Sequence, residues 1–111
     1  MATLSTHVLD TSRGRPAGGI TISLERLNAG EGWTPLSEAA TDEDGRVKHF
    51  VLSESDLGPG TYRLVFSVEK YFKELNQPSF YPEVSVAFLI EPGVEHYHVP
   101  LLISPFGYST Y

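Results

Sequence analysis

Residues 95–111 read EHYHVPLLISPFGYSTY, and this stretch carries the pattern from which the fold is predicted. Residues 95–103 alternate in the manner of a β-strand, with His96 and His98 on one face and apolar side chains on the other. Residues 104–107 (Ser-Pro-Phe-Gly) supply turn residues, and residues 108–111 have the β-propensity of a second strand. The stretch therefore predicts a β-hairpin that presents two imidazoles on one face.

Upstream of this hairpin, apolar and polar residues alternate in one segment after another. Strands are predicted at residues 4–10, 20–27, 33–40, 47–51, 61–68 and 83–90. Pro35 lies inside one of them, which favours a strand at the start or edge of a sheet. Residues 91–93 (Glu-Pro-Gly) are predicted to form the hairpin turn that leads into the C-terminal stretch.

One segment has a different period. Between residues 68 and 75 the apolar side chains recur at helical spacing, and charged side chains fill the other positions. This pattern predicts one short helix at about residues 67–75. Short strands separated by frequent turns favour a β-sandwich over a parallel sheet. We therefore predict an all-β, two-sheet β-sandwich of about eight strands with one short helix, in which residues 1–111 form a single domain.

Composition and charge exclude several classes of function. The 111 residues carry a formal net charge of −6 and no cluster of Lys and Arg, so no nucleic-acid partner is expected. There is no cysteine, which excludes disulfides and thiolate metal sites. No apolar stretch approaches the ~20 residues of a membrane span, and the N-terminus lacks the apolar segment of a signal peptide. We expect a cytoplasmic protein with no membrane partner. The peroxisome is the alternative location, although the sequence does not end in the peroxisomal signal Ser-Lys-Leu.

The last predicted strand is short and aromatic. An exposed strand of this kind offers unpaired backbone groups to a second copy of the chain. A chain of 111 residues that exposes apolar or aromatic side chains also tends to associate. An oligomer formed in part by extension of a sheet is therefore expected.

Three residues far apart in the sequence could form a catalytic site. His7 lies in the strand at residues 4–10, and Arg46 directly follows the acidic turn at residues 41–45. His7 and His98 have the pKa range needed for general acid–base catalysis, and Arg46 could bind an anionic substrate or stabilise charge on a carbonyl oxygen. The plainer alternative is that each is an ordinary surface residue, because spacing alone does not show that the three side chains meet.

Motifs for metal and cofactor chemistry are weak or missing. His96 and His98 share a face, which is a metal-ligand spacing, but a third ligand is needed and no cysteine can supply it. The sequence has no phosphate loop, dinucleotide glycine motif, Gly-x-Ser-x-Gly elbow or His-Glu-x-x-His motif. We therefore expect no metal and no cofactor.

Four stretches of the chain carry a family resemblance. They are residues 4–10 (LSTHVLD), 41–46 (TDEDGR), 96–102 (HYHVPLL) and 104–111 (SPFGYSTY). Together they resemble the transthyretin-related 5-hydroxyisourate hydrolases, and the similarity runs essentially from end to end. The family's chains usually close with Tyr-Arg-Gly-Ser, and this sequence ends at Tyr111.

The resemblance implies an assembly and a reaction. It implies a homotetramer built as a dimer of dimers, with a channel lined by the positions that match His7, Arg46, His98 and Tyr111. The implied reaction opens the ring of 5-hydroxyisourate at an amide-type C–N bond and gives 2-oxo-4-hydroxy-4-carboxy-5-ureidoimidazoline in urate breakdown. His98, assisted by His7, would activate water, and Arg46 would bind the ring and stabilise the oxyanion.

Two other function classes remain open at this point. The hormone carrier transthyretin resembles these hydrolases in architecture, but it has lysine, glutamate and threonine at the positions matching His7, Arg46 and His98. Such a set binds aromatic ligands without acid–base chemistry. A purely structural or interaction module is the third class, and it would leave the three polar residues without a role.

Overall fold

Alternating apolar and polar residues form strands over most of the chain. The computed structural model describes residues 2–50 and 57–111. Its elements in chain order are β1 (Thr3–Asp10), β2 (Arg15–Pro16), β3 (Thr21–Leu27), β4 (Trp33–Ala40), β5 (Arg46–Val47), β6 (Gly60–Phe66), α1 (Val68–Glu74), β7 (Val84–Ile90), β8 (His96–Ser104) and β9 (Gly107–Thr110).

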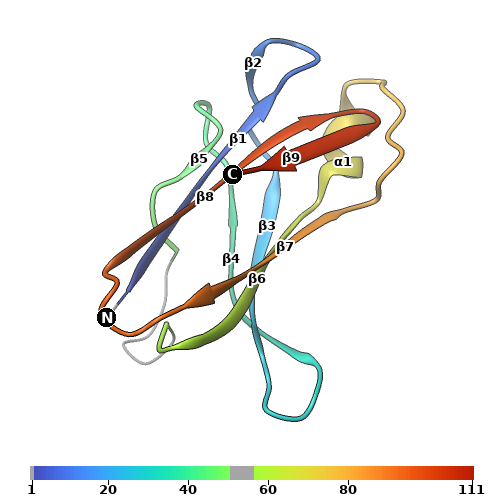
Figure 1. Ribbon diagram of the computed structural model, residues 1–111. Coiled ribbons are helices and arrows are strands. Elements are labelled where there is room, and N and C mark those ends of the chain that lie inside the picture. Colours follow the sequence, from blue (N-terminus) through green and yellow to red (C-terminus); the bar gives the residue numbers. More distant parts are fainter. Residues whose placement is uncertain (1, 51–56) are drawn as a thin grey trace.

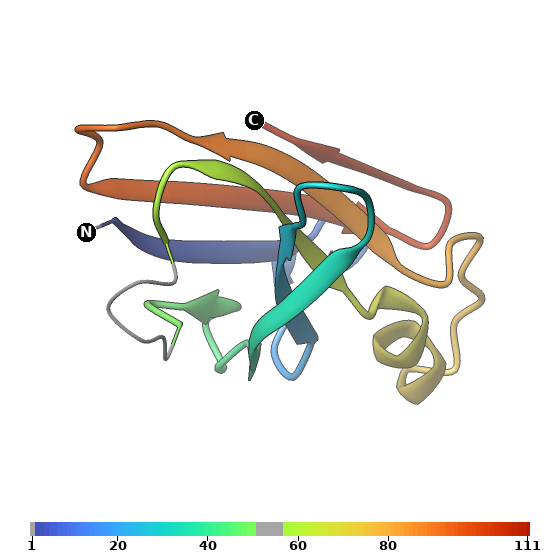
Figure 2. The ribbon, with the colours of Figure 1, turned by 90° about the horizontal axis from the view of Figure 1, so that it is seen from below.

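The strands form two sheets, which Figures 1 and 2 show from two directions. The first sheet has the order β2-β1-β8-β9, and β5 also pairs with β1. The second has the order β4-β3-β6-β7, so β4, the strand that contains Pro35, lies at an edge. The predicted two-sheet all-β fold with one short helix is confirmed. The two-residue strand β2 was not predicted, so the strand number in the described residues slightly exceeds the prediction.

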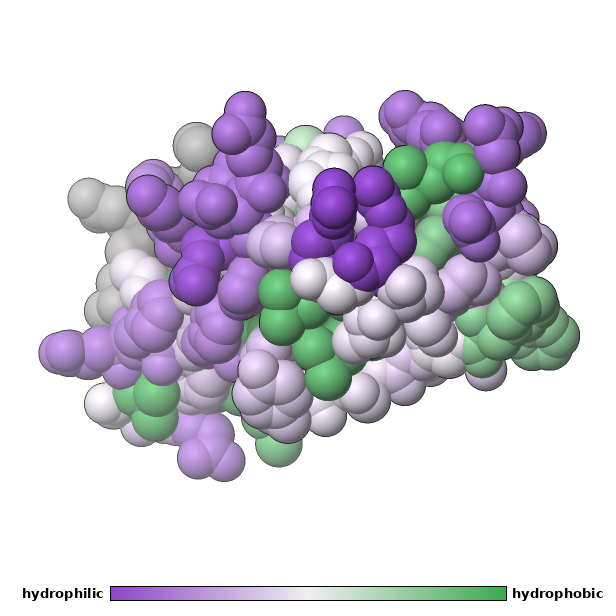
Figure 3. Space-filling model, turned by 90° about the horizontal axis from the view of Figure 1, so that it is seen from above, coloured by the Kyte–Doolittle hydropathy of each residue, from purple (hydrophilic) through white to green (hydrophobic). Residues whose placement is uncertain are grey.

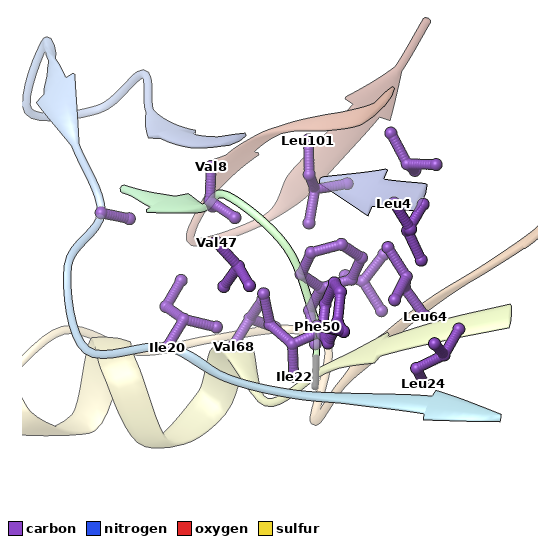
Figure 4. Close-up of a cluster of buried hydrophobic side chains, with 14 of the residues drawn as sticks. Leu4, Val8, Ile20, Ile22, Leu24, Val47, Phe50, Leu64, Val68 and Leu101 are labelled. Carbon is purple, nitrogen blue, oxygen red and sulfur yellow. The ribbon is translucent and has the colours of Figure 1, made fainter. Parts of the chain in front are cut away.

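The core lies between the inner faces of the two sheets (Figure 4). Every second residue of β1 from Leu4 to Asp10 is buried, as the predicted strand parity requires. The fully buried apolar side chains include Leu4, Val8, Ile22, Leu24, Leu64, Leu101 and Ile103. Each side chain of this size stabilises the fold by about 1.5–3 kcal/mol relative to exposure. Because the buried side chains of β1 and β8 face the core, the alternate side chains of these two strands face outward.

The helix packs at one end of the sandwich through the apolar face that its spacing predicts. Val68, Tyr71 and Phe72 are its buried residues. The Tyr71 hydroxyl donates a hydrogen bond of 2.8 Å to Oδ2 of Asp10, a carboxylate with no exposed surface. Burial is the main cause that raises the pKa of Tyr71 above its ordinary value. The end of β1 is therefore tied to α1. Within the described residues, no helix has the length and apolar character needed to span a bilayer.

The predicted hairpin turn at residues 91–93 is wrong. A turn is present there, but β7 pairs with β6 in one sheet and β8 pairs with β1 and β9 in the other. The connection therefore crosses between the sheets. Glu-Pro-Gly indicates only that the chain changes direction, whereas the pairing partner of β8 is set by its long parallel register with β1.

The predicted strand at residues 47–51 is also corrected. It begins one residue earlier, at Arg46, and ends at Val47, while Val51 lies outside the described residues. Val47 is buried in the core and Arg46 is exposed, so the short strand keeps a two-residue alternation. Arg46 is therefore part of a strand, where it occupies a fixed position beside β1.

Candidate functional site

The outer face of the first sheet carries the candidate site. β1 and β8 run parallel, with Ser5 opposite His98 and His7 opposite Pro100. Residues directly opposite each other in a sheet share a face, so His7 and His98 lie on the same side, offset by two positions. The two histidines therefore lie on one face of the sheet within a single chain.

Arg46 joins them through a third strand. β5 pairs antiparallel with β1, and Arg46 lies directly opposite His7. The preceding turn is held by Asp42, whose Oδ1 accepts hydrogen bonds from the backbone N–H groups of Arg46 at 3.0 Å and Asp44 at 2.9 Å. The bond from Arg46 is the main cause that lowers the pKa of Asp42. The acidic turn thus fixes the backbone from which the guanidinium extends.

A shallow depression of about 190 Å³ lies beside these strands. It is lined by Ser5, Thr6, Arg46, Val47, Lys48, His96 and His98. His7 is not among the lining residues, although its partner Arg46 is. Within the described part of the chain, the one ion pair is between Arg63 and Glu25. No carboxylate of these residues forms an ion pair with Arg46. The guanidinium is therefore available to an electron-rich ligand.

Two hydroxyl groups on β1 contact the histidines of β8. The Ser5 Oγ atom lies 2.9 Å from Nδ1 of His98 and 3.2 Å from Nε2 of His96. The Thr3 Oγ1 atom lies 2.6 Å from Nδ1 of His96. Thr3 and Ser5 are not among the site residues predicted from the sequence. Their place at every second position before His7 is the signal that identifies them, once β8 is known to pair with β1.

The environment of His98 favours its neutral form. Partial desolvation of the ring is the main cause that lowers the pKa of His98 below 6.5, although the residue as a whole stays exposed, and the positive charges of His7, His96 and Arg46 act in the same direction. A neutral imidazole at physiological pH can accept a proton from water. The electrostatics therefore suit His98 to act as a general base.

Tyr111 lies farther from this group. It follows β9 directly, and its side chain is 83% exposed. The Thr110 hydroxyl donates a hydrogen bond of 2.6 Å to the Pro100 carbonyl, which holds the end of the chain beside β8. Tyr111 does not line the depression described above, so its role in substrate binding stays a prediction. Among residues 2–50 and 57–111, no group of three or more His, Cys, Asp or Glu side chains could hold a metal ion.

Comparison with known proteins assigns the family. The family model described as "HIUase/Transthyretin family" matches residues 4–111. The chain belongs to this family. A probable 5-hydroxyisourate hydrolase from Caenorhabditis elegans is 49% identical over 110 residues, which cover 99% of this chain and 80% of that protein. The 5-hydroxyisourate hydrolase of Mus musculus is 48% identical over 109 residues, which cover 97% of this chain and 92% of that protein.

Solved structures of the HIUase/Transthyretin family agree with the fold. A 5-hydroxyisourate hydrolase from Klebsiella pneumoniae has a TM-score of 0.84 at 40% identity, over 100% of this chain and 97% of that one. Transthyretin from Sparus aurata has a TM-score of 0.91 at 30% identity, and the match covers 100% of this chain and 96% of that one. The backbone is therefore closer to the transthyretin and the sequence closer to the hydrolase. Because a shared fold does not decide function, the side chains on the outer face must do so.

Replacing Gly45 with alanine is expected to destabilise this family member and to displace Arg46. Gly45 has a φ of +74°, and an added Cβ would meet the Val8 carbonyl oxygen. The positive φ alone costs about 1–3 kcal/mol for a residue other than glycine, and the close contact adds to that cost. Urea unfolding of the variant should show a loss of at least this size. Gly30→Ala is the control, because nothing lies within 4 Å of its added Cβ; equal stability of the two variants would contradict the expectation.

Proposed function

We propose that this protein hydrolyses 5-hydroxyisourate to 2-oxo-4-hydroxy-4-carboxy-5-ureidoimidazoline, a step of urate breakdown. The observation that carries the proposal is the gathering of His7, Arg46 and His98, from three separate strands, on one face of a sheet. Two relatives that are 48–49% identical to this chain over the aligned residues are named a probable 5-hydroxyisourate hydrolase and a 5-hydroxyisourate hydrolase. The reaction needs a base and an oxyanion partner, and the gathered residues are of both kinds.

The proposed reaction begins with attack of water on the carbonyl carbon of an amide-type C–N bond in the ring. His98 accepts a proton from the water as its oxygen bonds to the carbon, and the carbonyl oxygen gains negative charge. The imidazolium then returns a proton to the leaving nitrogen, the C–N bond breaks, and the ring opens to a carboxylic acid, which releases its proton to the solvent and becomes a carboxylate. Water is the only co-reactant, so atoms and charge balance without a cofactor.

The other residues have complementary roles in this proposal. Arg46 binds the electron-rich ring and stabilises the oxyanion through its planar set of N–H donors. His7, directly opposite Arg46 on β1, assists His98 in moving the proton. Tyr111 contacts the substrate from the end of the chain. The roles of His98, Arg46 and His7 follow from residue type, charge and position on the shared face, whereas that of Tyr111 follows from the family resemblance alone.

Ultraviolet absorbance tests the reaction directly. Freshly made 5-hydroxyisourate decays spontaneously, and the protein is expected to accelerate this decay in proportion to its concentration. Boiled protein and an equal mass of serum albumin serve as controls for non-specific effects. Decay at the spontaneous rate with a folded sample would overturn the hydrolase and favour a carrier.

A carrier of small aromatic ligands is the second candidate. It is favoured by the TM-score of 0.90 to a sea bream transthyretin structure in complex with thyroxine, at 31% identity. A carrier would bind its ligand without consuming it. Titration with an aromatic ligand, followed by recovery of that ligand unchanged, separates this candidate from the hydrolase when combined with the absorbance assay.

We also propose that the protein acts as a homotetramer, a dimer of dimers. β9 and β7 are edge strands, and they and their neighbouring turns expose large apolar side chains, among them Leu89 at 60%, Phe106 at 66% and Tyr108 at 46%. Figure 3 shows separate hydrophobic patches among hydrophilic side chains on one face. Exposed strand edges with apolar side chains favour pairing between copies. Sedimentation should give four times the 12.3 kDa mass of one chain; a single-chain mass with full turnover would contradict this.

A further inference from the structure

A continuous chain of hydrogen-bonding groups connects His98 to the backbone at the start of β8. It passes from His98 Nδ1 to Ser5 Oγ (2.9 Å), from Ser5 Oγ to His96 Nε2 (3.2 Å), and from His96 Nδ1 to Thr3 Oγ1 (2.6 Å). It ends at the carbonyl oxygen of Glu95, 3.3 Å from Thr3 Oγ1. The parallel register sets Thr3 opposite His96 and Ser5 opposite His98, so two hydroxyls alternate with two imidazoles.

The Glu95 carbonyl at the end of this series of groups favours one of the two directions in which the hydrogen bonds can run. A backbone carbonyl can only accept, and in this direction the Thr3 hydroxyl donates its single hydrogen to Glu95, whose carbonyl oxygen also accepts from the Thr3 backbone N–H at 2.9 Å. Thr3 Oγ1 then accepts from the N–H at Nδ1 of His96, which leaves Nε2 of a neutral His96 ring as an acceptor. The Ser5 hydroxyl donates to that nitrogen, and its oxygen accepts from Nδ1–H of His98.

We propose that Thr3, His96 and Ser5 are positioning residues that hold His98 in its Nδ1–H tautomer and present an unprotonated Nε2 to the substrate. The hydrogen bond made by one ring nitrogen sets the state of the other. A neutral imidazole without such partners populates both tautomers, and the Nε2–H form cannot take a proton at the exposed nitrogen. Only the kinetic test of this inference rests on the proposed function.

The positive charges around His98 favour the neutral form of its imidazole. His7 faces it from β1 and Arg46 from β5, while His96 is its neighbour on β8; Lys48 lines the same depression. All of these are basic groups, and no acidic side chain lines the depression among the described residues. A second positive charge on His98 is therefore unfavourable, in agreement with the lowering of its pKa that burial and these neighbours cause.

Nitrogen-15 NMR of the imidazoles tests the tautomer without any substrate. In the unaltered protein at pH 7.5, His98 should show a protonated Nδ1 and an unprotonated Nε2. Ser5→Ala removes the acceptor and should give a mixture of both tautomers, whereas Ser5→Thr keeps a hydroxyl on the strand and should restore the original signals. Protonation of His98 on Nε2 in the unaltered protein would overturn the inference, as would an unchanged tautomer in Ser5→Ala.

The kinetic readout separates positioning from general damage. Ser5→Ala should lower kcat for 5-hydroxyisourate roughly 10-fold to 100-fold with little change in KM, the same range as for hydrogen-bond partners that orient metal-binding histidines. The fall in the activity of this variant at low pH, the acid limb of its pH–rate profile, should move to lower pH, because the lost acceptor also stabilised the imidazolium of His98. Ser5→Thr should restore both values. An unchanged limb in Ser5→Ala, or no rescue by threonine, would contradict the inference. Absence of any turnover in the unaltered protein would defeat the proposed function, while the NMR result would still decide the tautomer.

Discussion

Replacing His98 with asparagine is expected to lower kcat for 5-hydroxyisourate by about 10²–10⁴-fold, the usual contribution of a positioned general base. Asparagine keeps an amide N–H that can reach Ser5 Oγ, now 2.9 Å from the ring, but it cannot accept a proton from water. The fold should persist, because His98 is exposed on the outer face and contributes nothing to the core. Stopped-flow absorbance measures the loss. His49→Asn is the matched control, since it removes an exposed imidazole that does not line the depression.

The pH dependence of the unaltered protein gives an independent check on His98. The base must be neutral, and burial together with nearby cations lowers its pKa below 6.5. Activity should therefore be constant near pH 7 and fall only as the pH drops through a value below 6.5. This acid limb should be absent from the residual activity of His98→Asn. A flat profile from acid to neutral pH in the unaltered protein, or undiminished turnover in the variant, would remove His98 from the role of base.

The strands of the core were predictable because burial imposes a strict alternation. β4 has the bounds that the sequence predicts, β3 differs from its prediction by one residue at its start, and β8 differs by one residue at each end. Inner and outer faces follow from the same pattern, since an error of one residue would put polar groups such as Ser5 into the core. Local periodicity therefore specifies most of the fold.

Pairing between distant strands was not predictable from local pattern. The turn at residues 91–93 reverses the chain direction in a way that suits a hairpin, yet β8 joins the other sheet. Its partner is chosen by eight paired positions with β1, which no local signal reports. The same long-range register brings Thr3 and Ser5 to the histidines of β8, which explains why these two hydroxyls escape prediction from the sequence.

The candidate site was predictable in residue type but not in geometry. His7, Arg46 and His98 are chemically suited to acid–base and oxyanion roles wherever they lie, and a family resemblance selected them from the other polar residues. Their convergence depends on β5, a strand of two residues that has almost no sequence signal of its own. Asp42 and Gly45 fix that strand through turn hydrogen bonds and a positive φ, so the turn chemistry determines where the guanidinium lies.

Replacing Arg46 with glutamine is expected to lower kcat by about 10²–10³-fold, as does the loss of one oxyanion donor in other hydrolases. KM should also rise, because the same guanidinium binds the ring before the reaction. Glutamine preserves the backbone N–H that donates to Asp42 at 3.0 Å, so the turn and β5 should remain in place. Arg46→Lys should recover only part of the activity, since an ammonium lacks the planar pair of donors.

The fold supplies a matched control for this prediction in Arg15. β2 and β5 are both two-residue strands that pair with β1, and each begins with an arginine: Arg15 lies opposite Asp10 and Arg46 opposite His7. Arg15→Gln therefore removes the same charge from the same sheet at a position away from the histidines. If loss of net positive charge were the cause, both variants would slow equally, and the rate would recover at high ionic strength. A loss confined to Arg46→Gln, present at low and high salt alike, assigns the effect to a donor that touches the reacting oxygen; equal losses in both variants would refute that role.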